Sequence, residues 1–293
     1  MNEYTTLPEL REYLSLASQN TTDDGTLNRF IEQAARTIDR TCRRNFYPRR
    51  LTLKYDLPED ESVLDFQFDV LEVKGLSDMN GASFITSGSY FLKTGNVYNL
   101  TPYTKIELNW AFGRLFNYSS TPQQAVQVDS VVGYHEDYDN AWINTNATLT
   151  SSATSAQTLL TISGSLIDDV WGNPSAIKAK NIIKIDEEYF YVLSGSNDVT
   201  INTKRAINGT SAASHAANMA IYVWKPEYDI QFANKELAAF QYMAAQSPRT
   251  GRTIVPSYGG FTIDDPDSWP SQTRERLERY INREVYNLGF ADD

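Results

Sequence analysis

The spacing of apolar residues changes twice along this chain, and this change limits the folds that the chain can adopt. Near the N-terminus apolar residues recur every three or four positions, which predicts a helix from about Asp24 to Arg44. Its stripe consists of Leu27, Phe30, Ile31, Ala34, Ala35, Ile38 and Cys42. From Leu51 to Trp224 apolar and polar residues alternate between turns rich in Gly and Asn, as in antiparallel strands. Helical spacing returns from Ile230 to Gln246.

Both ends of the chain carry signals for a further helix. Thr6 and Glu9 have the spacing of a capping box, and Pro8 stands in the first turn, where its missing N–H costs nothing. A last helix is expected to begin near 268–271 and to run past Leu277. The element order predicts an α+β fold, with a small helical bundle formed by the N- and C-terminal helices and a large antiparallel β insertion between them. The expected units are residues 1–50, 51–146, 147–225 and 226–293: N-terminal helices, first β region, second β-module and C-terminal helices.

The charge of the chain is acidic and unevenly distributed. The formal net charge is −11 at pH 7, and residues 51–228 contain 20 acidic and 11 basic side chains, whereas residues 1–50 contain 7 and 8. This balance argues against a dedicated nucleic-acid binder, which presents a basic face. No apolar run approaches the roughly 20 residues of a membrane span, so we expect no membrane association. The single cysteine, Cys42, excludes an intrachain disulfide and fits a reducing compartment.

A search for catalytic and metal-binding patterns is negative. His135 and His215 lie far apart and have no ligand spacing around them, and no glycine-rich phosphate loop or Gly-x-Ser-x-Gly motif is present. Cys42 lies on an apolar helical stripe, which favours a buried structural thiol over a nucleophile. The acidic run at 136–139 offers oxygens for calcium, but without a recognisable loop spacing we expect a solvated turn. We therefore expect neither an enzyme nor a bound cofactor or metal.

Arginines cluster where the second helix is expected to end. On that helix Arg36, Arg40, Arg43 and Arg44 are predicted to share one face at three- and four-residue steps. We consider three interpretations: contact with an acidic protein surface in a homo-oligomer or an adjacent ring, a solvated face, and contact with DNA phosphates. The net charge weighs against the third. The full set of interface candidates is Arg36, Arg40, Arg43, Arg44, Arg49, Arg50, Arg276 and Arg283.

Two stretches of the chain resemble the head–tail connector (adaptor) proteins of tailed bacteriophages. The first is Leu7–Tyr47, with its Leu-Pro-Glu-Leu start and its Ile-Asp-Arg-Thr-Cys-Arg-Arg-Asn-Phe-Tyr end. The second begins with Pro226-Glu227-Tyr228-Asp229-Ile230 and continues to Trp269-Pro270-Ser271 and Tyr280. The resemblance covers roughly residues 1–50 and 226–285. It implies a non-enzymatic virion protein of the phage neck, assembled in the host cytoplasm.

The same resemblance implies a particular assembly. Members of this family form a homo-oligomeric ring, usually of twelve copies, which docks on the portal, extends the DNA channel and offers a platform for tail or neck proteins. Packaged DNA passes through such a ring without sequence-specific binding, and an acidic lumen suits that passage because like charges repel. The long β insertion departs from the minimal family pattern.

A second resemblance lies inside the insertion. Residues 186–192, Asp-Glu-Glu-Tyr-Phe-Tyr-Val, and residues 204–215, with Arg205, Asn208-Gly209 and His215, are similar to a β-module that recurs in phage virion proteins. Asn208-Gly209 suits a turn with positive φ, and His215 is expected to be a hydrogen-bonding turn residue. Ala206 stands where this motif often has Gly, so we expect the local turn to differ from the motif.

Other functional classes remain open from the sequence. One is another neck or tail-completion protein of the same virion. A second is a β-rich module that binds carbohydrate or a receptor, for which Trp142, Trp171 and Trp224 are the candidate stacking residues. A third is a virion hydrolase, which lacks a recognisable active site here.

Overall fold

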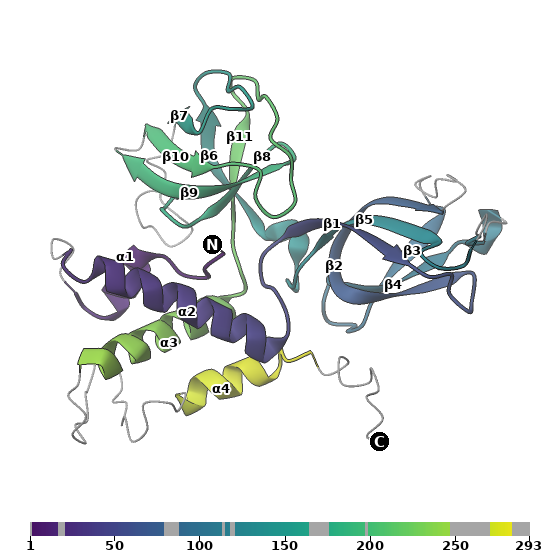
Figure 1. Cartoon of the computed structure of the whole chain (residues 1–293), viewed down its shortest axis with the longest axis horizontal. Coiled ribbons are helices and arrows are strands. Elements are labelled where there is room, and N and C mark those ends of the chain that lie inside the picture. The colour runs from purple at the N-terminus through teal and green to yellow at the C-terminus, as the bar shows by residue number, and fades with distance from the viewer. Residues whose placement is uncertain are drawn as a thin grey trace.

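The computed structural model describes residues 2–16, 21–78, 88–112, 115–117, 121–163, 176–196, 199–246 and 270–282. Across these residues the chain forms four α-helices, a five-stranded sheet and a closed six-stranded barrel (Figure 1). The α+β class is therefore confirmed. The helices are α1 (Leu7–Tyr13), α2 (Asp24–Cys42), α3 (Tyr228–Gln246) and α4 (Ser271–Glu278). Among the described residues no helix combines the length and apolar character needed to cross a membrane.

Helix α1 starts with the capping interaction that the sequence predicts. The Glu9 carboxylate accepts hydrogen bonds from the Thr6 backbone N–H at 2.8 Å and from the Thr5 hydroxyl at 2.9 Å. This satisfies one of the backbone donors that a helix start leaves without a partner. Leu10, one position further along the helix, is fully buried in an apolar cluster with residues of α2 and α3. The short helix is thus anchored at both its start and its apolar face.

Helix α2 buries most of the predicted stripe and ends two residues earlier than expected. Its last turn closes at Arg43, which adopts a left-handed φ of 53° and donates its backbone N–H to the Asp39 carbonyl. Because the chain turns away there, Arg43 and Arg44 leave the helix that holds Arg36 and Arg40. The expectation that these four arginines share one helical face is wrong.

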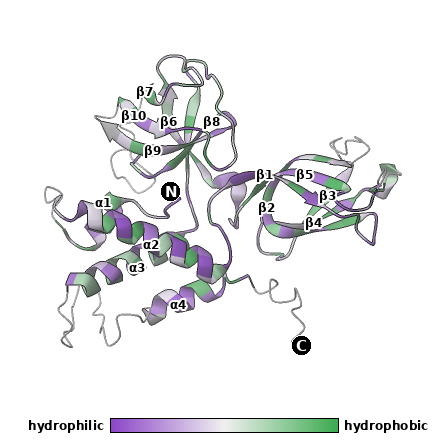
Figure 2. Cartoon of the chain, in the orientation of Figure 1, coloured by the Kyte–Doolittle hydropathy of each residue, from purple (hydrophilic) through white to green (hydrophobic). Residues whose placement is uncertain are grey.

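Helix α3 packs against the other three helices. Besides an apolar layer with α1 and α2, the Asn234 side chain donates to the Ile31 carbonyl at 3.1 Å, and Tyr242 donates to Asp23 at 2.8 Å. The Thr273 hydroxyl of α4 donates to the buried Glu236 carboxylate at 2.9 Å. In Figure 2 hydrophilic and hydrophobic residues share each helix, as in amphipathic helices packed on one side. The first and last parts of the sequence thus lie side by side.

The first β region is one antiparallel sheet in the order β1-β5-β2-β4-β3. Its strands are β1 (Arg49–Tyr55), β2 (Val63–Asp78), β3 (Tyr90–Thr94), β4 (Tyr103–Leu108) and β5 (Val126–Val132), with a 3-10 turn at Trp110–Phe112. Strand β2 changes partner at Val70, pairing with β4 before it and with β5 after it. Strand β3 begins at Tyr90, and residues 79–87 lie outside the described residues. The sheet has its own apolar core, which includes Leu64, Ile106 and Val128.

The second β region closes into a barrel in the order β10-β7-β6-β11-β8-β9. Its strands are β6 (Trp142–Leu149), β7 (Leu159–Ser163), β8 (Ile182–Ile185), β9 (Glu188–Ser196), β10 (Thr200–Lys204) and β11 (Ala220–Trp224). Strand β6 begins before the predicted boundary at residue 147, so the barrel includes residues 142–146. A separate apolar core fills it, with Phe190, Ile183 and Ile221 fully buried.

Helices, sheet and barrel meet in one cluster of buried aromatic residues, which we call the hub. Phe46, just after α2, contacts Tyr4, Tyr134 and Tyr280 edge to face, with ring centroids 5.7–5.8 Å apart. Trp224, at the end of β11, donates its indole N–H to the Phe46 carbonyl at 3.1 Å. Phe46 and Tyr280 are fully buried. One residue therefore touches segments that are far apart in the sequence.

Candidate functional site

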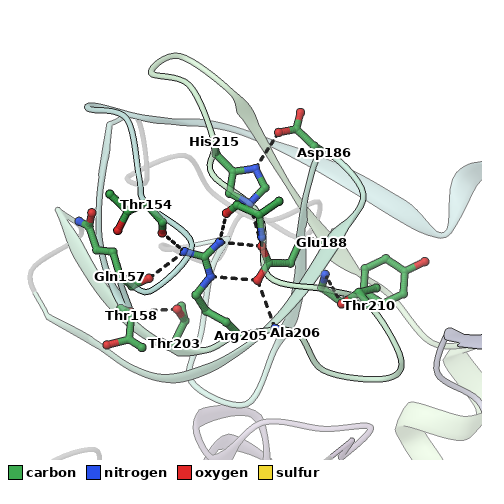
Figure 3. Close-up of polar contacts among 12 residues, drawn as sticks. Thr154, Gln157, Thr158, Asp186, Glu188, Thr203, Arg205, Ala206, Thr210 and His215 are labelled. Carbon is green, nitrogen blue, oxygen red and sulfur yellow. Dashed lines mark hydrogen bonds and ion pairs between the residues drawn. The ribbon is translucent and has the colours of Figure 1, made fainter.

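A buried network of charges lies inside the barrel wall, centred on Glu188 at the start of β9 (Figure 3). The Glu188 side chain is 1% exposed, and that of Arg205 is 6% exposed. Arg205 donates from Nε and Nη2 to the two carboxylate oxygens at 2.9 and 2.6 Å. The backbone N–H groups of Ala206 and Ala213 donate to the same carboxylate at 3.2 and 2.9 Å. Burial alone would raise the pKa of Glu188, but these hydrogen bonds outweigh it and the pKa is lowered.

Arg205 is fully used within this network. Its remaining N–H groups donate to the backbone carbonyls of Thr154, Gln157 and Ala213, and its guanidinium lies 5.0 Å from the Phe190 ring centre. A guanidinium has five N–H donors, and all of them find an acceptor here. The pair therefore joins strands β9 and β10 to the loops at 154–157 and 206–213, which is a structural task.

His215 extends the network to the surface. Its Nε2 lies 3.0 Å from Glu188 Oε2, and its Nδ1 lies 2.7 Å from Asp186 Oδ2. Both ring nitrogens thus lie at hydrogen-bond distance from a carboxylate oxygen. The prediction that His215 is a hydrogen-bonding residue is confirmed, but its backbone forms an isolated antiparallel bridge with Ala153 and not a turn. A cavity of about 460 Å³ beside it is lined by Ser211 and Ser214, but neither nitrogen of His215 is left to activate their hydroxyls.

The turn before His215 explains why this sequence builds the network. Asn208 and Gly209 have φ of 53° and 84°, as the sequence predicts for this pair. Ala206 also has a positive φ, 51°, although it stands where the motif often has Gly. Its backbone N–H is held by Glu188, so the hydrogen bond offsets the strain of a left-handed alanine. The local turn therefore keeps a glycine-like backbone.

The contacts of the other histidine, His135, and of Cys42 also indicate structural roles. The buried His135 ring lies 3.1 Å from the Lys225 carbonyl through Nε2 and accepts the Asp137 N–H at Nδ1. Burial lowers its pKa, which favours the neutral ring. Cys42 is buried as predicted, and burial raises the pKa of its thiol to about 12. Nowhere in the described ranges do three or more His, Cys, Asp or Glu side chains gather as metal ligands.

Several of the candidate interface arginines have partners inside the chain. Arg44 lies 3.4 Å from an Asp69 carboxylate oxygen and 4.4 Å above the Tyr134 ring. Arg50 lies 3.8 Å from Glu187. Arg276 lies 4.0 Å from Glu236 and 4.3 Å from the Phe232 ring centre. These contacts bind the sheet, the barrel and α4 to their neighbours.

The remaining candidates differ in exposure. Arg40 and Arg43 are exposed, and Arg36 is half-exposed beside Glu32 and Asp39. Arg40 has no ion-pair partner among the residues described. Arg49 is half-buried at the start of β1 opposite Val132. Arg283 lies outside the described residues, so the structure does not place it. We use the name α2 arginine surface for Arg36, Arg40 and Arg43 together: the first two lie in the last turns of α2, and Arg43 is the residue at which the helix ends.

Several exposed apolar side chains were not expected from the sequence. Trp110 is 77% exposed, and Phe112 and Leu115 nearby are about half exposed. Val97 and Tyr98, in the β3–β4 loop, are almost fully exposed. The sequence pattern that could have indicated these exposed side chains is Trp110-Ala111-Phe112, which follows a strand and precedes no regular element. Apolar side chains gathered at a surface mark an interaction site more often than single ones do.

Of the tryptophans proposed for sugar stacking, the structure describes Trp142 and Trp224. Trp224 is buried, and its ring lies 5.2 Å from that of Trp142, which is half-buried and also packs on Tyr189. Trp171 lies outside the described residues. Because the Trp224 ring is buried, it has no exposed face on which a sugar could stack.

No family model and no curated protein matches this chain. Among solved structures, it is similar to a chain of a structure titled "Neck of empty GTA particle computed with C6 symmetry", with 19% sequence identity and a TM-score of 0.29. The alignment covers 47% of this chain and 73% of that chain. A likeness of this extent does not establish a shared fold.

Proposed function

We propose that this chain is a structural protein of a phage virion neck, and more narrowly one subunit of the head–tail adaptor ring between portal and tail. Its role is assembly rather than catalysis. The observation that carries the proposal is the packing of the two stretches whose motifs resemble adaptor proteins. Two β-modules separate these stretches in the sequence, yet the described parts of residues 1–50 and 226–285 form one helical unit.

The contacts between these stretches are specific. The Asn234 side chain of α3 donates to the Ile31 carbonyl of α2, and the Asn282 backbone N–H donates to the Cys42 carbonyl at 2.9 Å. Phe46 and Tyr280, one from each stretch, pack edge to face. Buried polar groups and aromatic geometry of this kind specify one arrangement of the helices. The β-modules are then additions to a unit made by the chain ends.

The proposed ring places demands on charge and symmetry. In a cyclic ring each interface is heterologous, so one patch of a copy meets a different patch of the next. The family that the motifs resemble uses about twelve copies, docks on the portal and receives tail or neck proteins. With a net charge of −11, a ring of such copies repels packaged DNA and lets it pass without sequence-specific binding.

Negative-stain microscopy of the purified protein mixed with portal tests the proposal. We expect rings stacked on the portal vertex. In the variant Arg40→Glu we expect weaker ring assembly. The charge-matched control Arg29→Glu, at another exposed position of α2, is expected to assemble as the wild type does. Ring formation that fails at every protein concentration, with folded wild-type protein, would overturn the adaptor assignment.

A different neck position is the second candidate. The exposed side chains at Val97 and Tyr98 favour a protein with more than one docking surface, which also fits a stopper or tail-completion protein. Such a protein would bind the tail end and leave the portal bare in the same images.

A further inference from the structure

The chain after β4, at the outer end of the five-stranded sheet, carries three exposed apolar side chains close together in the sequence, Trp110, Phe112 and Leu115, which we call the apolar patch. Their exposed fractions are 77%, 47% and 48%. Hydrogen bonds fix this segment beside the β1–β2 loop: the Leu108 N–H donates to the Ser62 carbonyl and the Phe116 N–H to the Glu61 carbonyl, both at 2.8 Å. An exposed tryptophan on an ordered segment is a typical anchor of a protein interface.

Acidic residues lie in the β1–β2 loop beside this segment. Glu59, Asp60 and Glu61 are exposed in the β1–β2 loop, and no Lys or Arg occurs from residue 55 to residue 73. Asp60 accepts hydrogen bonds from the Ser62 hydroxyl at 2.6 Å and the Ser62 N–H at 2.9 Å, and these lower its pKa. We call the patch and these three carboxylates the arm tip. An apolar centre with a charged rim is the usual anatomy of a protein–protein interface.

The chemistry that complements the arm tip is a set of arginines. A guanidinium stacks on an indole or phenyl face and pairs with carboxylates at the same time, which a lysine does less well. This chain carries such a set on the α2 arginine surface, where Arg40 and Arg43 are exposed. Its charge is opposite to that of the arm tip.

One molecule cannot bring these two surfaces together. Strand β1 starts six residues after Arg43 and runs for seven residues to the β1–β2 loop. At about 3.3 Å per residue this strand separates the arm tip from its own α2 by roughly 20 Å. Figure 1 shows the free end of the sheet pointing away from the helices. A contact between an arm tip and an α2 arginine surface therefore has to join two molecules.

We propose that the arm tip of one copy docks on the α2 arginine surface of the next copy. The contact is heterologous and head to tail, so it propagates around a ring when the rotation closes. This inference rests on the proposed ring and names the surfaces that build it. Trp110 is the apolar anchor, and the carboxylates at 59–61 set the register against Arg40 and Arg43.

Charge exchange on the full chain tests the contact. The first variant, Glu59→Lys with Glu61→Lys, has a basic tip; the second, Arg40→Glu with Arg43→Glu, has an acidic α2 surface. Each variant alone brings like charges together and is expected to raise the concentration needed for ring assembly by about tenfold or more. An equal mixture of the two variants is expected to restore assembly. Copies of the two kinds then alternate around the ring, and opposite charges meet at every contact. Sedimentation velocity with and without portal measures assembly.

Controls separate the contact from folding and from net charge. Asp139→Lys and Arg29→Glu reverse exposed charges elsewhere and are expected to assemble as the wild type does. Trp110→Ser is expected to weaken assembly without lowering the thermal unfolding temperature, since its ring is solvent-exposed. Far-UV circular dichroism confirms that each variant is folded.

The outcomes are distinguishable. If wild-type rings form and the mixture of variants does not recover assembly, the contact is wrong while the adaptor proposal stands. If the tip variants form rings normally but no longer bind portal, the partner of the arm tip is the portal and not a second copy. If the wild type forms no ring under any condition, both proposals fail.

Discussion

At the scale of single residues, the barrel depends on charges that are buried in pairs. Glu188 accepts hydrogen bonds from Arg205, His215 and two backbone N–H groups, so both of its oxygens are saturated. Buried ion pairs add little net stability compared with apolar residues of the same shape, but removing one partner leaves the other charge uncompensated. The network therefore specifies the loop positions and makes the barrel sensitive to single substitutions.

Replacing Glu188 by Gln is expected to lower the free energy of unfolding by about 3–5 kcal/mol, because the Arg205 charge stays buried without a counter-charge. The matched control is Glu187→Gln, one position earlier. The Glu187 side chain is 67% exposed and pairs with Lys74 at 3.1 Å, so its loss is expected to cost under about 1 kcal/mol. Urea denaturation followed by circular dichroism compares the two. Equal losses would contradict the structural role of Glu188.

A second residue-scale prediction concerns pH. Burial raises the pKa of Asp39 to about 6, against the effects of its hydrogen bond from Tyr4 and of Arg36. In the unfolded chain an aspartate titrates near pH 4, at about 3.9. The folded state binds this proton more tightly, so Asp39 contributes stability at low pH that is lost as the pH rises from about 4 to about 6.

Asp39→Asn removes this titration. The free energy of unfolding of the variant, minus that of the wild type, is expected to rise between about pH 4 and pH 6 and to stay level above about pH 7. Urea denaturation at a series of pH values measures this difference, with the exposed Asp139→Asn as control. A difference that does not change across that range would show that Asp39 is not perturbed.

At the scale of elements, two glycines set how closely strands approach other backbone. Gly133, after β5, has φ +143°, and a Cβ there would lie 2.5 Å from the Tyr47 carbonyl oxygen. Gly209, in the barrel, has φ +84°, and a Cβ there would overlap the Arg50 carbonyl oxygen of β1. The Arg50 N–H also donates to the Asn208 carbonyl at 2.8 Å. The barrel and the sheet thus meet backbone to backbone at a position that only glycine fits.

Gly209→Ala is expected to destabilise the protein by at least about 1–3 kcal/mol, because strain and overlap act together. Gly25→Ala, in the first turn of α2, is the matched control: nothing lies within 4 Å of the added methyl group. The free energy of unfolding of that variant is expected to rise by about 0.4–1 kcal/mol, since alanine has less conformational freedom than glycine to lose on folding. Scanning calorimetry measures both. Effects of the same sign would argue against the close approach at Gly209.

At the scale of the whole molecule, the hub couples three bodies that each have a core of their own. The sheet, the barrel and the α1–α3 helices bury separate apolar clusters, and the fourth cluster joins them through Phe46, Tyr134, Tyr280 and Trp224. The hub therefore links α2 to the sheet that carries the arm tip. The proposed ring depends on this link, because a ring cannot close when the angle between α2 and the sheet differs from copy to copy.

Phe46→Ala is expected to lower the free energy of unfolding by about 3–5 kcal/mol and to weaken the packing of all three bodies together. Hydrogen exchange followed by mass spectrometry resolves this by segment. Exchange is expected to increase in α2, in β5 and in β11. Phe66→Ala, which packs against the sheet core, is expected to affect the sheet alone. An effect of Phe46→Ala confined to the helices would show that the hub does not couple the bodies.

Local patterns were sufficient for the elements themselves. The stripe from Leu27 to Cys42, the Glu9 cap and the alternating segments predicted α1, α2, α3 and most of the strands, though not the start of β6, and Asn208-Gly209 predicted its turn. Each of these depends on neighbours within a few residues, so the sequence by itself determined them. The end of α2 was missed because a left-handed arginine at position 43 has no local signature.

Contacts between distant residues were decided only by the tertiary structure. The sequence could group Arg40 with Arg44, but the partner of Arg44 is Asp69, which the chain brings near through β2. It could not show that Trp224 is buried at the hub while Trp110 is exposed on the arm tip, because both follow or end a strand of similar composition. Burial and ion pairing depend on which elements pack together, and that is a property of the assembled fold.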